Sequence, residues 1–195
     1  MIPILILAAG QSSRMGGRDK LLEDVGGHPL LQRQIGVAMA VGNTFVALGA
    51  EHSERFKITE QTGAMPLIAP HAKNGIGATL ADCVRQLPQC DAFMVVLADL
   101  VALTSDDLRS VLDAREMQPE ALLWRGATLR NEPGHPVIFS AQLRVKFADL
   151  HGDQGADVIA RPLQDQTVLV PLPGDNARLD LDTPQDWTRW RARSN

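Results

Sequence analysis

The residues with the clearest capacity for chemistry follow the first apolar run of the chain: Leu7-Ala8-Ala9-Gly10-Gln11-Ser12-Ser13-Arg14-Met15-Gly16, and then Lys20. A Gly/Ser-rich turn between a buried strand and a helix gathers backbone N–H groups around one point, and the helix dipole adds positive potential there. Arg14 and Lys20 supply the positive charge that a polyphosphate requires. The segment therefore predicts a nucleotide-binding loop.

Two common kinds of nucleotide-binding loop are excluded by spacing. A Walker A loop needs a glycine, four residues and then Gly-Lys-Ser/Thr, whereas Lys20 is followed by Leu21. The Gly-x-Gly-x-x-Gly fingerprint of dinucleotide-binding folds is absent from this segment as well. The loop therefore belongs to another class of nucleotide-binding protein.

A second candidate site follows the apolar run Phe93-Met94-Val95-Val96-Leu97, which predicts a buried strand. Asp99 comes directly after this run, at the carboxyl end of the expected strand, where open α/β sheets bind their ligands. A carboxylate at that position can hold a divalent cation against phosphate oxygens. Further along, alternation in Leu179-Asp180-Leu181-Asp182 puts Asp180 and Asp182 on the same strand face. The competing interpretations are that Asp99 only caps a turn and that Asp182 only starts a helix.

The pattern Leu-Ala-Ala-Gly-x-Ser-x-Arg-Met-Gly-x-x-x-Lys resembles the signature loop of the MobA-like NTP transferase domain, in its molybdenum cofactor cytidylyltransferase branch. The resemblance implies transfer of CMP from CTP to molybdopterin or its molybdenum form, with release of pyrophosphate. It further implies Mg2+ held by Asp99 and Asp182, and catalytic roles for Arg14 and Lys20. The nucleotide-binding residues that it implies are Leu7, Ala8, Ala9, Gly10, Ser12, Ser13, Arg14, Lys20, Gly75, Gly77 and Thr79.

The resemblance also extends to the loops expected on the acceptor side of the site, where it implies roles for His135, Pro136 and Asp153. One departure from the family pattern stands out. The family has Asp-x-Pro at this place, whereas Leu100 and Val101 follow Asp99 in this chain. The sequence therefore does not determine the shape of the turn after Asp99. His28, His52 and His71 show no ligand spacing and receive no role.

Composition narrows the class of protein. The chain has 195 residues and a net charge of −4, which argues against nucleic acid as a partner, because nucleic-acid-binding domains carry a basic excess. Two cysteines form neither a disulfide framework nor a zinc site, and Cys83 is expected in the core. No segment predicts a membrane span or a signal peptide, so we expect a cytoplasmic protein.

Apolar runs alternate with helical patterns, which predicts a three-layer α/β/α Rossmann-like fold with a mostly parallel sheet, in one domain over residues 1–195. An antiparallel edge hairpin is expected between residues 121 and 170. The expected strands are Ile4 to Ala9, Phe45 to Leu48, Pro66 to Ala69, Phe93 to Leu97, Ala121 to Trp124, Val137 to Phe139 and Val168 to Val170. The expected helices are Leu30 to Val41, Ser53 to Thr62, Ala78 to Leu87, Ser105 to Arg115, Ala141 to Leu150 and Pro184 to Arg193.

Three alternatives to the cytidylyltransferase hypothesis stay open. The donor could be GTP, although guanylyl-transferring relatives have Leu-Ala-Gly-Gly where this chain has Ala9, whose β-carbon narrows the base pocket and favours a pyrimidine. The acceptor could be a sugar or polyol phosphate. The chain could also be a carrier of the cofactor that has no catalytic activity. In the enzyme hypothesis, transient contact with a molybdoenzyme or its chaperone is a further expectation.

Overall fold

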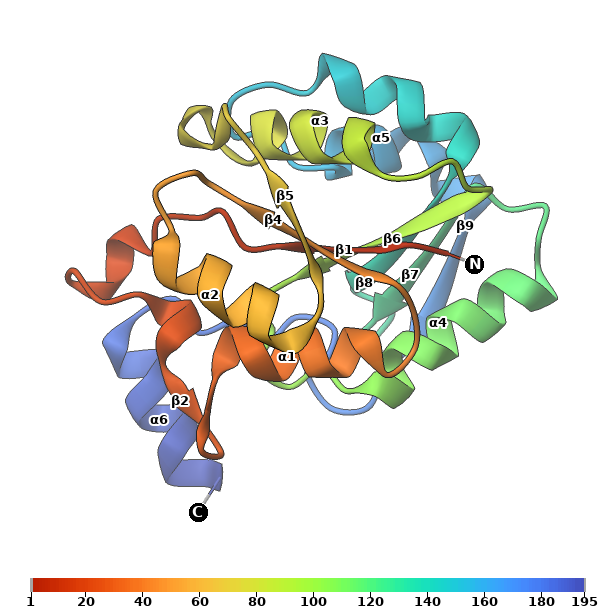
Figure 1. The fold of residues 1–195 in the computed structure, drawn as a ribbon. Coiled ribbons are helices and arrows are strands. Elements are labelled where there is room, and N and C mark those ends of the chain that lie inside the picture. The colour runs from red at the N-terminus through yellow and green to blue at the C-terminus, as the bar shows by residue number, and fades with distance from the viewer. Residues whose placement is uncertain (1, 195) are drawn as a thin grey trace.

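A seven-stranded sheet forms the centre of the computed structural model, which describes residues 2–194 (Figure 1). Across the sheet the strands are ordered β5 (Met65–Ile68), β4 (Thr44–Leu48), β1 (Ile4–Leu7), β6 (Ala92–Leu97), β8 (Pro133–Ser140), β7 (Leu123–Ala127) and β9 (Thr167–Pro171). All pair in parallel except β8, which is antiparallel to both of its neighbours. The prediction of a mostly parallel sheet is therefore confirmed.

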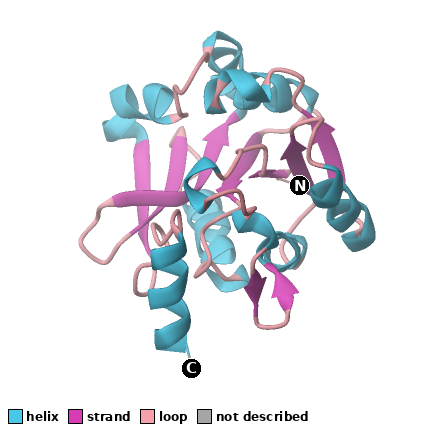
Figure 2. Cartoon of the chain, turned by 90° about the vertical axis from the view of Figure 1, so that its left-hand side faces the viewer, coloured by secondary structure: helices cyan, strands magenta, loops and turns pink. Residues whose placement is uncertain are grey.

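Helices cover both faces of the sheet, as the α/β/α prediction requires (Figures 1 and 2). One face carries α1 (Leu30–Met39), α2 (Ser53–Thr62) and α4 (Ser105–Met117). The other face carries α3 (Ile76–Gln86), the 3₁₀ helix η4 (Ala141–Asp149) and α5 (Asp157–Ala160). The last helix, α6 (Pro184–Ser194), lies beside a two-stranded ribbon of β2 (Asp24–Val25) and β3 (His28–Pro29).

Alternating residues of the central strands supply two separate cores. In β1, Ile4 and Ile6 face the α1 and α4 layer and belong to the first core. Leu5 faces the α3 layer and belongs to the second core. Strands buried on both faces read as continuous apolar runs, which is why β1 and β6 were recognisable in the sequence. Cys83 of α3 is fully buried in the second core, as expected.

Most expected elements are present within one to three residues of their expected bounds, and α2 has the expected bounds. The segment from Ala141 to Asp149 is a 3₁₀ helix, and the ribbon β2–β3 had no signal in the sequence analysis. The antiparallel hairpin of β7 and β8 exists but does not form the sheet edge, because β9 pairs outside β7. Among residues 2–194, none of the helices is long and apolar enough to cross a membrane.

Candidate active site

The candidate site lies where the strand order of the sheet reverses. From β1 the chain proceeds outward to β4 and β5, and then returns to β6 on the other side of β1. The loops after β1 and β6 therefore diverge from adjacent carboxyl ends, and this crevice is where open α/β sheets bind ligands. The loop from Ala8 to Lys20 follows β1, and Asp99 follows β6.

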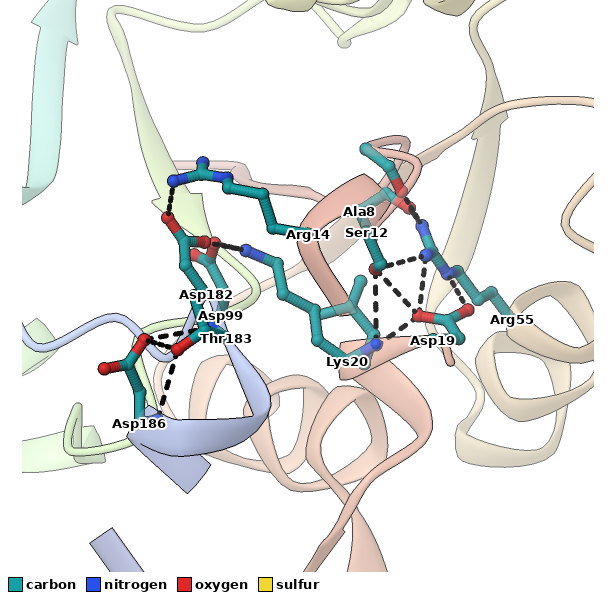
Figure 3. Close-up of polar contacts among 12 residues, drawn as sticks. Ala8, Ser12, Arg14, Asp19, Lys20, Arg55, Asp99, Asp182, Thr183 and Asp186 are labelled. Carbon is teal, nitrogen blue, oxygen red and sulfur yellow. Dashed lines mark hydrogen bonds and ion pairs between the residues drawn. The ribbon is translucent and has the colours of Figure 1, made fainter. Parts of the chain in front are cut away.

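Two aspartates that are far apart in the sequence converge on one ammonium group (Figure 3). Lys20 Nζ lies 2.5 Å from Asp99 Oδ2 and 2.7 Å from Asp182 Oδ1, while Arg14 Nη1 lies 2.7 Å from Asp182 Oδ2. Burial alone would lower the pKa of Lys20, but the two carboxylates outweigh that effect and raise it above the usual value. The expected metal ligands and the expected catalytic cations thus form one cluster.

The turn after Asp99 is held without the proline that the family pattern would place there. Its carbonyl oxygens accept hydrogen bonds from two side chains of α1: Gln34 Nε2 donates to Leu100 O at 2.9 Å, and Arg33 Nη1 donates to Val101 O at 2.7 Å. Leu100 and Val101 are buried in the first core. An isolated antiparallel bridge between Leu100 and Asp180 joins this turn to the segment that carries Asp182.

Asp182 is positioned by the start of α6. Thr183 and Asp186 form a reciprocal capping box: Asp186 N donates to the Thr183 hydroxyl at 3.2 Å, and Thr183 N donates to the Asp186 carboxylate at 3.0 Å. Pro184 begins the helix, as expected. Asp182 is therefore free of the capping task, which was the competing interpretation of its position, and its carboxylate binds Lys20 and Arg14 instead.

The loop after β1 differs in one respect from the expectation. No α-helix follows it directly: the chain makes two short 3₁₀ turns, η1 (Ser13–Met15) and η2 (Lys20–Leu22), and α1 begins only at Leu30. Gly16 and Gly17, both at positive φ, end the first turn before it can extend. The expected contribution of a helix dipole is therefore wrong, and any anion cradle here depends on the loop's own N–H groups and on side-chain cations.

Arg55 and Asp19, to which the sequence analysis gave no role, hold this loop in place. Arg55 of α2 is buried, with 2% of its side chain exposed, and it forms a bidentate pair with Asp19, both nitrogen–oxygen distances being 2.7 Å (Figure 3). Asp19 also accepts from the Ser12 hydroxyl and from Leu21 N. Burial raises the pKa of Asp19, but Arg55 outweighs it and holds this pKa below the usual value. Nothing in the sequence of α2 distinguishes Arg55 from the other polar residues of this helix, so its contact with Asp19 was not predicted.

A cavity of about 500 Å³ opens beside the cluster and gathers many of the expected nucleotide-binding residues. The expected residues that line it are Leu7, Ala8, Ala9, Gly10, Lys20, Gly75, Thr79, Asp99 and Asp153. Ser12, Ser13, Arg14, Gly77 and Asp182 are not part of this lining. The Ser12 hydroxyl instead accepts from Lys20 N at 3.2 Å, inside the loop, and the Thr79 hydroxyl donates to Gly75 O at 3.3 Å.

The opposite wall of the cavity is formed by the start of α3 packed against the loop 151–155. Gly77 N donates to Gly152 O at 2.9 Å. Gly75 has a φ of +106°, and a β-carbon there would lie 2.3 Å from Gly152 O, so this approach requires glycine. Gly75 and Gly77 therefore allow the loop 151–155 to pack closely enough for Asp153 to line the cavity.

A second, smaller cavity of about 240 Å³ adjoins the first, and the two share Leu7, Ile76 and Leu97 in their lining. His135 and Arg125 face it, whereas Pro136 is buried in β8. Burial, with the charge of Arg125, lowers the pKa of His135 to about 4, so the ring is neutral at pH 7. Its Nδ1 lies 3.4 Å from Val95 O, an oxygen that only accepts, so Nδ1 carries the proton.

The donor set suits a divalent cation that completes its coordination with phosphate. Among the described residues, no three or more His, Cys, Asp or Glu side chains are grouped as a self-sufficient metal site. Mg2+, however, is commonly bound through one or two carboxylates together with substrate phosphates. Asp99 Oδ1 is buried and makes no hydrogen bond within residues 2–194, so it offers a lone pair with no other partner.

Solved structures of mycobacterial proteins share this fold over nearly the whole chain. Rv0371c from Mycobacterium tuberculosis H37Rv is 25% identical, with a TM-score of 0.81 over 96% of this chain and 95% of that one. A further structure of that protein, 22% identical, is described as a complex with manganese; its TM-score is 0.78, and 96% of each chain is covered. Its homolog from Mycobacterium sp. strain JC1 is 24% identical, with a TM-score of 0.84 over 98% and 96% of the two chains.

A more distant structure shares the fold over nearly the same length. Molybdopterin-guanine dinucleotide biosynthesis protein A from Archaeoglobus fulgidus is 14% identical, with a TM-score of 0.70 over 99% of this chain and 98% of that one. No curated protein matches the sequence. The family model described as "MobA-like NTP transferase domain" matches residues 4–168, which contain the loop after β1, the Asp99 turn and both walls of the larger cavity. The chain therefore belongs to the MobA-like NTP transferase domain family and is a nucleotidyltransferase of that fold.

Proposed function

We propose that the protein transfers CMP from CTP to a phosphorylated acceptor, molybdopterin or its molybdenum form, and releases pyrophosphate. The observation that carries the proposal is the convergence of Asp99 and Asp182 on Lys20 beside the larger cavity. This arrangement brings together three parts. Asp99 and Asp182 would hold a divalent cation, Lys20 would neutralise negative charge on phosphate, and the larger cavity has room for a nucleotide. Nucleotidyl transfer requires these parts and little covalent chemistry from the protein.

In the proposed reaction an oxygen of the acceptor phosphate bonds to the α-phosphorus of CTP, while the bond from that phosphorus to the bridging oxygen of the β-phosphate breaks. Pyrophosphate leaves with that oxygen and its electron pair. The attacking phosphate is already an anion, so no protein base has to remove a proton. A neutral His135 with its proton on Nδ1 is consistent with this requirement.

Asp99 and Asp182 are the residues that would hold Mg2+, and the metal would supply charge neutralisation at the phosphate oxygens. The chain's own cations act on the same groups. Lys20 and Arg14 offset negative charge on the transferred phosphoryl group and on the departing pyrophosphate. Backbone N–H groups from the loop between Gly10 and Gly16 bind the phosphate chain, and Gly75, Gly77 and Thr79 lie toward the base.

The preference for cytosine is supported by Ala9. Ala9 lines the larger cavity and is 5% exposed, and its β-carbon takes up space that a glycine would leave to a purine. GTP as donor is the alternative, and the likeness to the Archaeoglobus fulgidus protein keeps it in view. We place the acceptor at the smaller cavity, near His135, and propose that Pro136 and Asp153 shape its entrance.

The test is pyrophosphate release from CTP and GTP in parallel, with and without Mg2+ and with and without molybdopterin. Asp99→Ala serves as the inactive variant, and Asp113→Ala, at an exposed position of α4, serves as the matched control. We expect release from CTP only when Mg2+ and the pterin are both present, and about a hundredfold less from Asp99→Ala, the usual cost of removing one transition-state stabiliser.

Release from GTP instead of CTP would contradict the assignment of the base. Tight binding of a nucleotide with no release under any condition would favour a carrier of the cofactor over an enzyme. Release with a sugar or polyol phosphate in place of the pterin would reassign the acceptor. If the enzyme assignment holds, handover of the product predicts transient contact with a molybdoenzyme or its chaperone, which a pull-down of the loaded protein would detect.

A further inference from the structure

Three consecutive carbonyl groups at the start of the nucleotide loop accept hydrogen bonds from one side of the molecule. Arg55 Nη1 donates to Ala8 O at 2.6 Å and to Gly10 O at 2.8 Å. His52, directly before α2, places its Nε2 3.2 Å from Ala9 O, an oxygen that can only accept. All three carbonyls of the loop's first turn therefore point toward α2.

The orientation of these carbonyls fixes the orientation of the next N–H groups. In a planar trans peptide the C=O of one residue and the N–H of the next point in opposite directions. The carbonyls of Ala8, Ala9 and Gly10 face α2, so the N–H groups of Ala9, Gly10 and Gln11 face away from it. These three residues line the larger cavity, and within residues 2–194 their N–H groups make no hydrogen bond.

The Arg55 side chain, which anchors these carbonyls, does not line the larger cavity. Arg55 is absent from the lining, and its remaining nitrogens bind Asp19, which also receives the Leu21 N–H beside Lys20. Its charge is therefore neutralised within the protein. One guanidinium thus holds the start of the loop through carbonyls and its end through Asp19 (Figure 3). Such a group acts on a ligand only through the backbone that it orients.

We propose that Arg55 and His52 are positioning residues that aim the N–H groups of Ala9, Gly10 and Gln11 at the phosphate chain of the nucleoside triphosphate. The inference rests on the proposed function in taking a nucleotide as the ligand. It assigns a function to α2, an element that contributes no side chain to the larger cavity. The consequence is a specific loss of affinity for phosphate groups when either anchor is removed.

Calorimetric titration with CTP and with CMP, at fixed Mg2+, tests this proposal. Arg55→Lys keeps the charge opposite Asp19, but its single compact ammonium cannot span the positions that the three nitrogens of the planar guanidinium reach. We expect its affinity for CTP to fall about tenfold, and its affinity for CMP to change less than about twofold, because hydrogen bonds that involve charged groups contribute on this scale. His52→Ala should weaken CTP binding about threefold. His52→Gln should restore it, since the glutamine amide can donate to Ala9 O.

Arg144→Gln is the matched control, because Arg144 also donates to several backbone carbonyls, those of Val84, Pro88 and Leu87, away from the site. It should lower thermal stability and leave both affinities unchanged. Parallel losses of CTP and CMP affinity in Arg55→Lys, or an unchanged CTP affinity in the folded variant, would overturn the proposal. If Arg55→Lys does not fold, equal CTP affinities of His52→Ala and His52→Gln overturn it instead. CTP binding that follows this pattern without pyrophosphate release would reject the proposed enzyme and leave the positioning roles intact.

Discussion

Lys20 is surrounded by more negative charge than it can neutralise alone. Asp99 and Asp182 both contact its ammonium group, and Asp180 lies close enough that burial and the charges of Asp182 and Asp99 raise the pKa of Asp180 above its usual value. With Arg14 also paired to Asp182, the cluster still has more carboxylates than cations, and this excess attracts further positive charge. The arrangement at the level of single residues therefore suits a site that assembles with a metal ion and a polyphosphate.

Removing the two cations of the cluster should have unequal effects. Lys20 has 15% of its side chain exposed, whereas Arg14 has 71% exposed, so solvent screens the charge of Arg14 far more. We expect Lys20→Ala to lower kcat/KM about a hundredfold or more, and Arg14→Ala to lower it about tenfold. Steady-state kinetics of pyrophosphate release would measure both. Turnover of Lys20→Ala near that of the wild type would refute its catalytic role.

The lowered pKa of His135 predicts that the folded protein becomes less stable as the pH falls. Burial and Arg125 lower its pKa to about 4 in the fold, while the unfolded chain has the usual value of about 6.5. The unfolded state therefore binds the proton first as the pH falls, so this stabilisation is complete above pH 6.5 and is lost between pH 6.5 and 4.

The comparison to make is urea unfolding at pH 7 and pH 5 for the wild type and for His135→Gln. We expect the wild type to lose more stability than the variant between these pH values, by on the order of 2 kcal/mol. Only the difference between the two pH values counts, so a change in absolute stability does not affect the outcome. An identical pH dependence in both proteins would contradict a buried neutral His135.

At the scale of elements, two helices begin with the same capping box. Thr104 and Asp107 start α4, and Thr183 and Asp186 start α6 next to Asp182. Thr104→Ala and Thr183→Ala should each cost about 1 kcal/mol of stability, the usual cost of losing an N-cap side chain.

Only Thr183→Ala should also lower the rate of pyrophosphate release, because it loosens the turn that positions Asp182. Thermal unfolding and turnover, measured on both variants, separate the two effects. Equal losses of turnover in Thr104→Ala and Thr183→Ala would show that the box at α6 has no special relation to the site.

Elements with strong local signals were predictable, and contacts between distant elements were not. The apolar runs of β1 and β6 and the first residues of α4 and α6 are readable because their causes lie within a few neighbouring residues. The roles of Arg55 and His52 depend on the packing of α2 behind a loop more than forty positions earlier in the chain. The ribbon β2–β3 has two residues in each strand, too few for a pattern to emerge.

At the scale of the whole molecule, the chain after β9 returns to complete the site. The family model ends at residue 168, yet Asp182 and α6 lie beyond it and meet residues from the first loop. Trp187 anchors this return, since it is 1% exposed within the first core. The Leu100–Asp180 bridge provides a second attachment at the Asp99 turn.

Trp187→Leu should therefore affect both the fold and the site. We expect a loss of stability on the order of 2 kcal/mol and weaker Mn2+ binding in titrations. Trp124→Leu, in β7 and 2% exposed, should cost similar stability and leave the metal affinity unchanged. A Trp187→Leu protein that binds Mn2+ as tightly as the wild type would contradict the anchoring role.

The triple contact of Lys20, Asp99 and Asp182 spans separations of 79 and 162 residues, so it exists only when distant parts of the chain have come together. A denatured chain has no comparable place for a metal-bound triphosphate. Ligand binding and folding are therefore thermodynamically linked, and saturation at a hundred times the dissociation constant would add about 2.7 kcal/mol to the stability of the native state. The nucleotide would then act on this protein as a folding ligand as well as a substrate.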